Sequence, residues 1–274
     1  LYSSAASDVY KRQDLYCPTA TSCSNYPSFF HTKRLVGVAT YTSADGSNWA
    51  AVGQWRLTHS FPDPGDGTNE KLFLESVQRM DPATSPVGSQ GTSLLPAVRF
   101  AKTAYNNRRD GSVSGGVSFQ PIFRVTRITD ELGKEINVAY ESPTQTFVSW
   151  RTDTSNAYPR WITWGSSEGW GVFRRWVVDQ VTVRDVVTGP STQSGTAVTP
   201  PETWDYTYVG GAAKRYTPDF WFEDNNRSYN VWRGFGEIVV THGTGSTKTV
   251  TKTRYYRGMH GDYNSSTGGT STVK

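Results

Sequence analysis

Four acidic residues within strand-like segments could take part in acid–base chemistry: Glu75, Asp179, Asp205 and Glu237. A glycoside hydrolase would need two of them on opposite sides of a sugar. Nothing in the neighbouring residues distinguishes such a pair, and no HExxH, GxSxG, P-loop or GxGxxG motif occurs in its usual setting. We therefore expect no catalytic residue, and a glycoside hydrolase is the least favoured of the functions considered.

Cys17 and Cys23 are the only cysteines, and five residues separate them. A disulfide between them would close a short loop and stabilise the fold by about 2 kcal/mol. Zinc would need two more ligands, and no second Cys or His pair has the required spacing. Two free thiols are the alternative, but we expect a disulfide in an exported protein.

Two further groups of residues could bind a metal ion, and both have a simpler interpretation. Asp63, Asp66 and Glu70 lie in the loop FPDPGDGTNE, but their spacing lacks the full calcium-loop pattern, and the prolines and glycines explain the loop as a turn. His59 lies on the apolar face of a strand-like segment, where a single histidine is more often a core residue than a ligand. We therefore expect no metal ion and no cofactor.

The segment 142–171 is rich in tryptophan and has no clear strand period, so we expect irregular structure there. Its tryptophans are Trp150, Trp161, Trp164 and Trp170. Such rings could stack on sugars or bases, or they could cover the open end of a sheet. We favour the second role.

The composition favours an all-β protein. The chain has 26 valines but only 9 leucines, and aromatic residues make up 14% of it, as suits a pleated sheet better than a helix. The formal net charge of +4 is not concentrated in any segment, because Arg108-Arg109 and Arg174-Arg175 are isolated pairs. We therefore expect no nucleic-acid partner. No apolar run is long enough to span a membrane.

The stretch Phe123–Glu141 is the clearest structural unit. Its two halves alternate with period two, and Asp130 to Gly133 form a polar turn between them. Gly133 is predicted to take a positive φ and to close a β-hairpin. The second strand ends in the pair Tyr140-Glu141.

Other segments repeat this plan and predict serial hairpins in one continuing antiparallel sheet. The segment from Phe173 to Asp185 has a change of parity, which predicts a β-bulge near Asp179-Gln180. Further strands are expected from Lys33 onward and in 54–61, 72–80 and 97–105, and two more hairpins in 176–208 and 228–256.

Residues 3–13, SSAASDVYKRQ, resemble the translation of a transposase adapter used in DNA sequencing libraries. A targeting peptide is the alternative, but this segment has no apolar core. We therefore expect residues 1–13 to be non-native and to pack against nothing, so that their deletion leaves the melting temperature unchanged. The natural sequence is then expected to begin near Asp14, inside a longer protein, and to form a single β-rich region over 14–274.

Several motifs resemble the RHS/YD-repeat family of large secreted bacterial toxins and wall-associated proteins. RVTRITDELGKEINVAYE is similar to one YD repeat, with Tyr140-Glu141 where Tyr-Asp is usual. Four other segments are similar to the region that precedes the main repeat array: TKRL (32–35), FPDPGDGT (61–68), WRGFGEIVV (232–240) and YYRGMHGD (255–262).

This resemblance implies a β-shell built from a spiralling sheet of hairpins, in a protein that is secreted or displayed on a bacterial cell surface. The shell would enclose a C-terminal toxin encoded downstream, so the partners would be the remainder of the same polypeptide and, in addition, cell-wall glycans. We expect a structural segment with no catalytic activity. A carbohydrate-binding β-domain at the cell surface is the alternative.

Overall fold

The computed structural model describes residues 33–66, 70–82, 92–108, 121–141, 157–164, 167–187, 196–197, 200–216, 228–229, 231–243 and 245–262. These residues form β-strands, turns and one short 3₁₀ segment, η3 (Gly245–Thr247), so the all-β prediction is confirmed. The adapter-like residues and the predicted disulfide partners Cys17 and Cys23 lie outside the described residues.

Thirteen strands are present in the described part of the chain. They are β1 (Gly37–Thr42), β2 (Ala50–Ser60), β3 (Phe73–Met80), β4 (Val98–Asn106), β5 (Pro121–Thr129), β6 (Lys134–Glu141), β7 (Ala157–Trp164), β8 (Ser167–Arg174), β9 (Val177–Val187), β10 (Thr196–Ala197), β11 (Glu202–Arg215), β12 (Val231–His242) and β13 (Thr249–Arg254).

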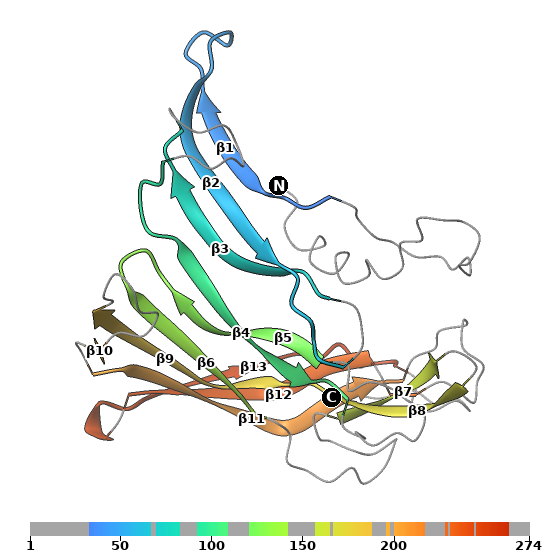
Figure 1. Ribbon diagram of the computed structural model, residues 1–274. Coiled ribbons are helices and arrows are strands. Elements are labelled where there is room, and N and C mark those ends of the chain that lie inside the picture. Colours follow the sequence, from blue (N-terminus) through green and yellow to red (C-terminus); the bar gives the residue numbers. More distant parts are fainter. Residues whose placement is uncertain are drawn as a thin grey trace, which may run out of the picture. The chain divides into compact units, whose positions relative to one another are not determined.

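Eleven of these strands form one antiparallel sheet (Figure 1). Its order is β1-β2-β3-β4-β5-β6-β9-β11-β12-β13, and the short β10 pairs with β9. The order follows the chain, because strands that follow one another in sequence usually pair. Between β6 and β9 the chain forms the separate pair β7–β8. The predicted continuation of one sheet through serial hairpins is therefore confirmed.

The chain divides into two compact units. The first unit comprises residues 1–103, 123–135 and 186–196, and the second comprises 104–122, 136–185 and 197–274. The first contains β1 to β3 in full, and the second contains β7, β8 and β11 to β13 in full.

The strands of the first unit form because β-branched and aromatic residues alternate with polar ones. In β2, Trp55 and Leu57 pair with Arg79 and Val77 of β3. The turn after β1 is closed by Asp45, whose carboxylate accepts hydrogen bonds from the amides of Ser47 at 2.9 Å and Asn48 at 2.8 Å.

In the second unit, β11 and β12 form a long antiparallel pair with aromatic rings along it. The ring of Trp204 stacks on that of its register partner His242, with centroids 4.4 Å apart and planes at 9°. Further along, Phe235 contacts both Tyr208, at 4.6 Å between centroids, and Trp232, at 5.6 Å. Such contacts are worth roughly 0.5–1.5 kcal/mol each beyond the area they bury.

Two sequence predictions about this unit are wrong in detail. The segment expected to be irregular contains the hairpin β7–β8, which forms a separate two-stranded sheet. Its aromatic and β-branched residues favour strands, although they show no simple alternation. Trp161 and Trp170 are partners in its register.

The expected strand at 173–185 is instead divided at Arg175-Trp176. The register of β9 with β11 has no shift from Val183 to Gln180, and the bulge near Asp179-Gln180 stays a prediction. The division coincides with hydrogen bonds to a distant part of the chain. The amide of Arg174 donates to the carbonyl oxygen of Asn107 at 2.8 Å, and the Trp176 indole donates to that of Asn106 at 3.0 Å.

Candidate functional site

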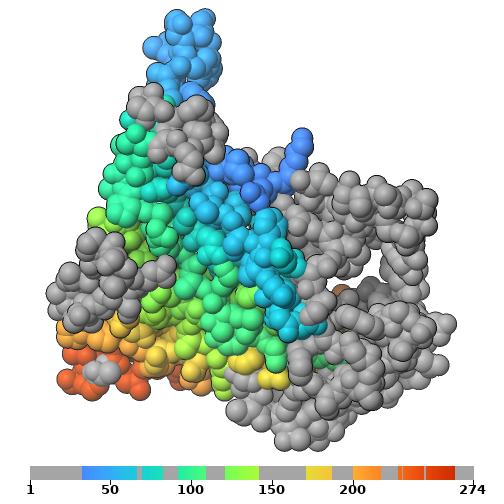
Figure 2. All heavy atoms as spheres, in the orientation of Figure 1, coloured from blue at the N-terminus to red at the C-terminus, as the bar shows by residue number. Residues whose placement is uncertain are grey.

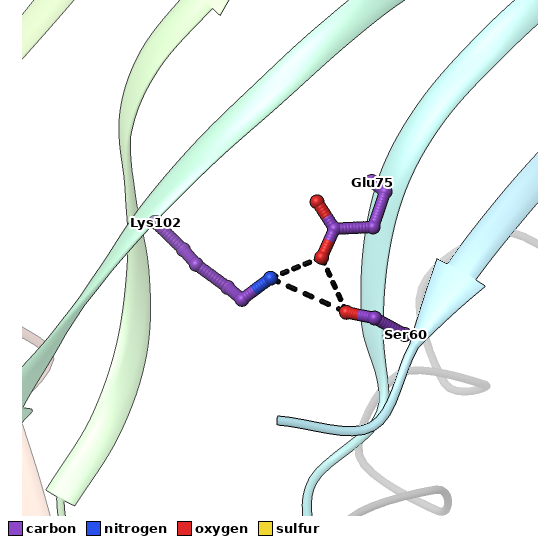
Figure 3. A network of polar contacts seen from close by, with 3 residues as sticks. All are labelled: Ser60, Glu75 and Lys102. Carbon is purple, nitrogen blue, oxygen red and sulfur yellow. Dashed lines mark hydrogen bonds and ion pairs between the residues drawn. The ribbon is translucent and has the colours of Figure 1, made fainter. Parts of the chain in front are cut away.

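A polar group that links three strands of the first unit is formed by Ser60, Glu75 and Lys102, which come from β2, β3 and β4 (Figure 3). The Lys102 ammonium donates a hydrogen bond to Ser60 Oγ at 3.2 Å and forms an ion pair with Glu75 Oε1. The hydroxyl of Ser60 donates to the same carboxylate oxygen. We call these residues the three-strand network.

A β-bulge in β3 determines the position of Glu75. Thr58 of β2 pairs with Ser76, and the next residue, His59, pairs with Leu74. Glu75 therefore has no partner in the register of β2 and β3. A bulge bends its strand and re-aims the side chain of the extra residue, so it accounts for the direction of the Glu75 carboxylate.

The other two residues of the network follow from ordinary strand pairing. Ser60 is the register partner of Phe73, which places their side chains on one face. The Lys102 ammonium lies over the Phe73 ring, 4.4 Å from its centroid. A cation over an aromatic face gains roughly 0.5–2 kcal/mol, depending on its exposure to water.

The charges of the network stabilise each other. Burial alone would raise the pKa of Glu75, but the hydrogen bonds from Lys102 and Ser60 and the charge of Lys102 outweigh it, so that pKa is lowered. The Glu75 carboxylate is therefore ionised at neutral pH. The side chains of Lys102 and Glu75 retain 19% and 34% of their exposure, so water still screens the pair in part.

Serine, carboxylate and lysine are also a combination that could support nucleophilic chemistry. Activation of the Ser60 hydroxyl would require a base whose pKa lies near the working pH. The lowered pKa of Glu75 makes this carboxylate a weaker base than an ordinary glutamate, and Lys102 donates to it rather than accepting a proton. The geometry suits the joining of three strands better than the activation of serine.

The carboxylates considered for glycoside hydrolysis have separate partners. Glu75 binds Lys102, Asp205 accepts from the side-chain Nε2 of Gln180 at 2.8 Å, and Glu237 accepts from Arg254 Nε at 2.9 Å. The fourth, Asp179, acts electrostatically on Tyr208. Burial, then the charges of Tyr206 and Asp179 among others, raise the pKa of Tyr208 to about 12, although its bond to the Val178 carbonyl opposes this.

Two of the predicted hairpin residues, Asp130 and Gly133, lie in the turn between β5 and β6. Gly133 has a φ of 91°, as the sequence predicted. The Asp130 carboxylate accepts hydrogen bonds from the amides of Leu132 at 2.9 Å and Lys134 at 2.8 Å. Asp130 also donates its own amide to the Lys134 carbonyl at 2.9 Å, which closes the turn.

The last two predicted hairpin residues lie at the far end of β6. Tyr140 contacts Tyr105 edge to face, with ring centroids 5.5 Å apart, and Tyr105 in turn contacts Trp176 at 4.7 Å. Glu141 is exposed at the end of the strand. The aromatic residue therefore packs, and the acidic residue remains in contact with water.

The candidate metal ligands form no cluster. Asp63 accepts a hydrogen bond from the Gly65 amide at 2.7 Å, and Gly65 has a φ of 78°, so this loop has the geometry of a turn. His59 is half-buried, and its pKa is lowered by burial and then by the charge of Arg34. Within the described ranges, no group of three His, Cys, Asp or Glu side chains could hold a metal ion.

Sequence reasoning did not identify Ser60 and Lys102, and it found no context for Glu75. It also missed Glu135, whose side chain is fully buried, with one carboxylate oxygen 3.7 Å from Arg127 Nη1. The strands that hold these residues carry other polar side chains, such as Lys134 and Asn137 in β6, so the sequence offers no clear signal.

Together these features define an antiparallel all-β protein whose polar side chains pair across strands. Comparison of the chain with protein-family models, with curated proteins and with solved structures finds no match. The described part of the chain has no helix with the length and apolar character needed to cross a bilayer.

Proposed function

We propose that this chain is a structural segment of a β-shell of the RHS/YD-repeat type, within a large secreted or surface-displayed bacterial protein. The shell encloses or presents an effector that lies further along the same polypeptide. In this role the segment has no catalytic activity, and its partners are the neighbouring parts of its own chain.

The observation that carries this proposal is the agreement between strand order and chain order. From β1 to β6, and then through β9, β11, β12 and β13, each strand of the sheet pairs with the next in the order of the chain. A sheet built in this way is lengthened by adding hairpins, without any crossover connection. A shell of variable length needs a sheet that can be extended by further hairpins.

The side-chain contacts support the same role. Glu75 with Lys102 and Glu237 with Arg254 are cross-strand pairs, as is Asp205 with Gln180. Each pair joins neighbouring strands, so these polar groups help to maintain register. To protect an enclosed effector, the shell needs a stable sheet rather than a reactive group.

Limited proteolysis of the full polypeptide tests this function. We expect the segment that follows the β-rich region to survive in the wild type and to be degraded when the shell is destabilised by Gly133→Val. Gly133→Asn is the matched control, because asparagine tolerates a positive φ better than valine does.

Two results would contradict the proposal. One is a protein with no protected segment after the β-rich region. The other is hydrolysis or tight binding of a glycan by the purified chain, lost in Glu75→Gln or in a tryptophan variant that remains fully folded. The second result would favour the enzymatic or the carbohydrate-binding alternative.

A further inference from the structure

Exposed apolar side chains are concentrated on one hairpin. Of the twelve large hydrophobic residues that are exposed in the described part of the chain, six lie between residues 35 and 52, on and beside β1 and β2. They are Leu35, Val36, Val38, Tyr41, Trp49 and Val52. The hairpin tip forms the projecting blue spheres of Figure 2. Apolar patches of this kind mark interaction surfaces.

One side of this hairpin is an edge of the sheet. Among the described strands, β1 pairs only with β2. The Leu57 amide donates to the carbonyl of Val36 at 2.9 Å, so Val36 and Leu57 form a hydrogen-bonded pair. Because such pairs alternate with non-bonded ones, the backbone groups of Gly37 and Ala39 point away from β2. They can accept another strand.

The two edge strands of the sheet differ in their protection. Edge strands are commonly protected from pairing by charged side chains, especially lysine. The last strand, β13, carries Lys252 and Arg254. From Leu35 to Ala44, the segment that contains β1 has no charged residue. Within the described residues, the sheet therefore has one edge protected by charge and one, β1, that is open to pairing.

We propose that β1 pairs antiparallel with β1 of a second copy of this chain across a two-fold axis, which joins the two sheets into one. The charges at the ends of β1 favour this partner. Lys33 and Arg34 precede the strand, and Asp45 follows it. Antiparallel pairing brings the basic end of each copy to the acidic end of the other, whereas parallel pairing would bring like charges together.

The two-fold arrangement also buries the apolar side chains of β1 and pairs its outward-pointing backbone groups. In such an interface the same surface faces itself, so an apolar strand buries an apolar strand. The outward amides and carbonyls of Gly37 and Ala39 gain partners. The loop that follows is already ordered by the hydrogen bonds to Asp45, so little flexibility is lost there on association. This inference does not rest on the proposed shell function.

Sedimentation of the purified chain over a range of concentrations tests the proposal. We expect the mass to rise from 30.4 kDa toward twice that value with concentration. Val38→Lys places a charge on each copy near the axis and is expected to raise the dimer dissociation constant at least about tenfold. Val250→Lys is the matched control, because it makes the same change on β13, and the mass should not alter.

A second variant and a second measurement distinguish a weakened dimer from a misfolded chain. Ala39→Pro removes an amide that points away from β2, so it weakens the dimer without breaking a bond within the hairpin. Hydrogen exchange in residues 35–42 should slow as the wild-type concentration rises, and it should not slow in either β1 variant. Exchange in β3 reports that the variants are folded.

Three results would overturn the proposal. The first is a wild-type chain that remains at 30.4 kDa at every concentration. The second is slow exchange in residues 35–42 of a monomer at all concentrations, which would mean that another segment of the same chain covers β1. The third is a mass that falls equally with Val250→Lys, or that grows without limit, since neither fits a closed two-fold contact through β1.

Discussion

The turn between β5 and β6 and the three-strand network differ in how far apart in the chain their partners lie. In the turn, Asp130 accepts hydrogen bonds from residues two and four positions away. In the network, Ser60 binds Glu75 from 15 positions away and Lys102 from 42 positions away. Both hold neighbouring strands in register.

The difference has consequences for stability. The turn depends on one backbone conformation, so its formation orders few residues and it can be damaged by a single change of shape. The network depends on prior pairing of three strands and on two ionised groups. It is therefore sensitive to charge and pH.

The largest expected effect is on the turn. Gly133 is buried and has a φ of 91°, a conformation that valine adopts poorly. Gly133→Val should lower the free energy of unfolding by about 1–3 kcal/mol in denaturant titrations. Gly133→Asn should cost less, and equal stability of the two variants would contradict the role given to this glycine.

The network should show a somewhat smaller effect. Lys102→Met removes the cation and leaves the Glu75 carboxylate half-buried without its charged partner. We expect a loss of about 1–2 kcal/mol, less than for a fully buried pair because water screens both groups. A double-mutant cycle with Glu75→Gln should give a coupling of about 1 kcal/mol. Additive single effects would mean that the two side chains do not interact in solution.

The Asp130 carboxylate permits a second test of the turn. Asp130→Ala removes the acceptor of two amide hydrogen bonds, and exposure to water compensates part of the loss. The expected cost is about 0.5–1 kcal/mol. Hydrogen exchange at Lys134 should accelerate, while exchange in β3 should not change. Faster exchange across β3 as well would show that the turn and the network are not independent.

The smallest expected effect is a dependence on pH that belongs to the network. The pKa of Glu75 is below its ordinary value of 4.5 in the folded protein, so its contribution is complete above that value and is lost as the pH falls through the folded pKa. The stability difference between wild type and Glu75→Gln should therefore shrink below about pH 4.5. A difference that stays constant from pH 7 to pH 3 would contradict this.

The features that the sequence predicted are those that depend on neighbouring residues, as the turn does. Alternation with period two predicted β1, β2 and the hairpin β5–β6, because a strand's own residues must face either side of the sheet. Gly133 was identifiable as the turn residue because a positive φ is a local requirement. The succession of hairpins was likewise visible, since strands that follow one another in sequence usually pair.

The tertiary structure decided what depends on residues distant in the chain. Glu75 enters the network because a bulge arises where β3 meets β2, and neither strand alone carries that signal. The break at Arg175-Trp176 depends on bonds to Asn106 and Asn107, which are far away in sequence. Local pattern determines which segments become strands, whereas the pairing of those strands determines which side chains meet, because pairing is selected by the energy of the whole sheet.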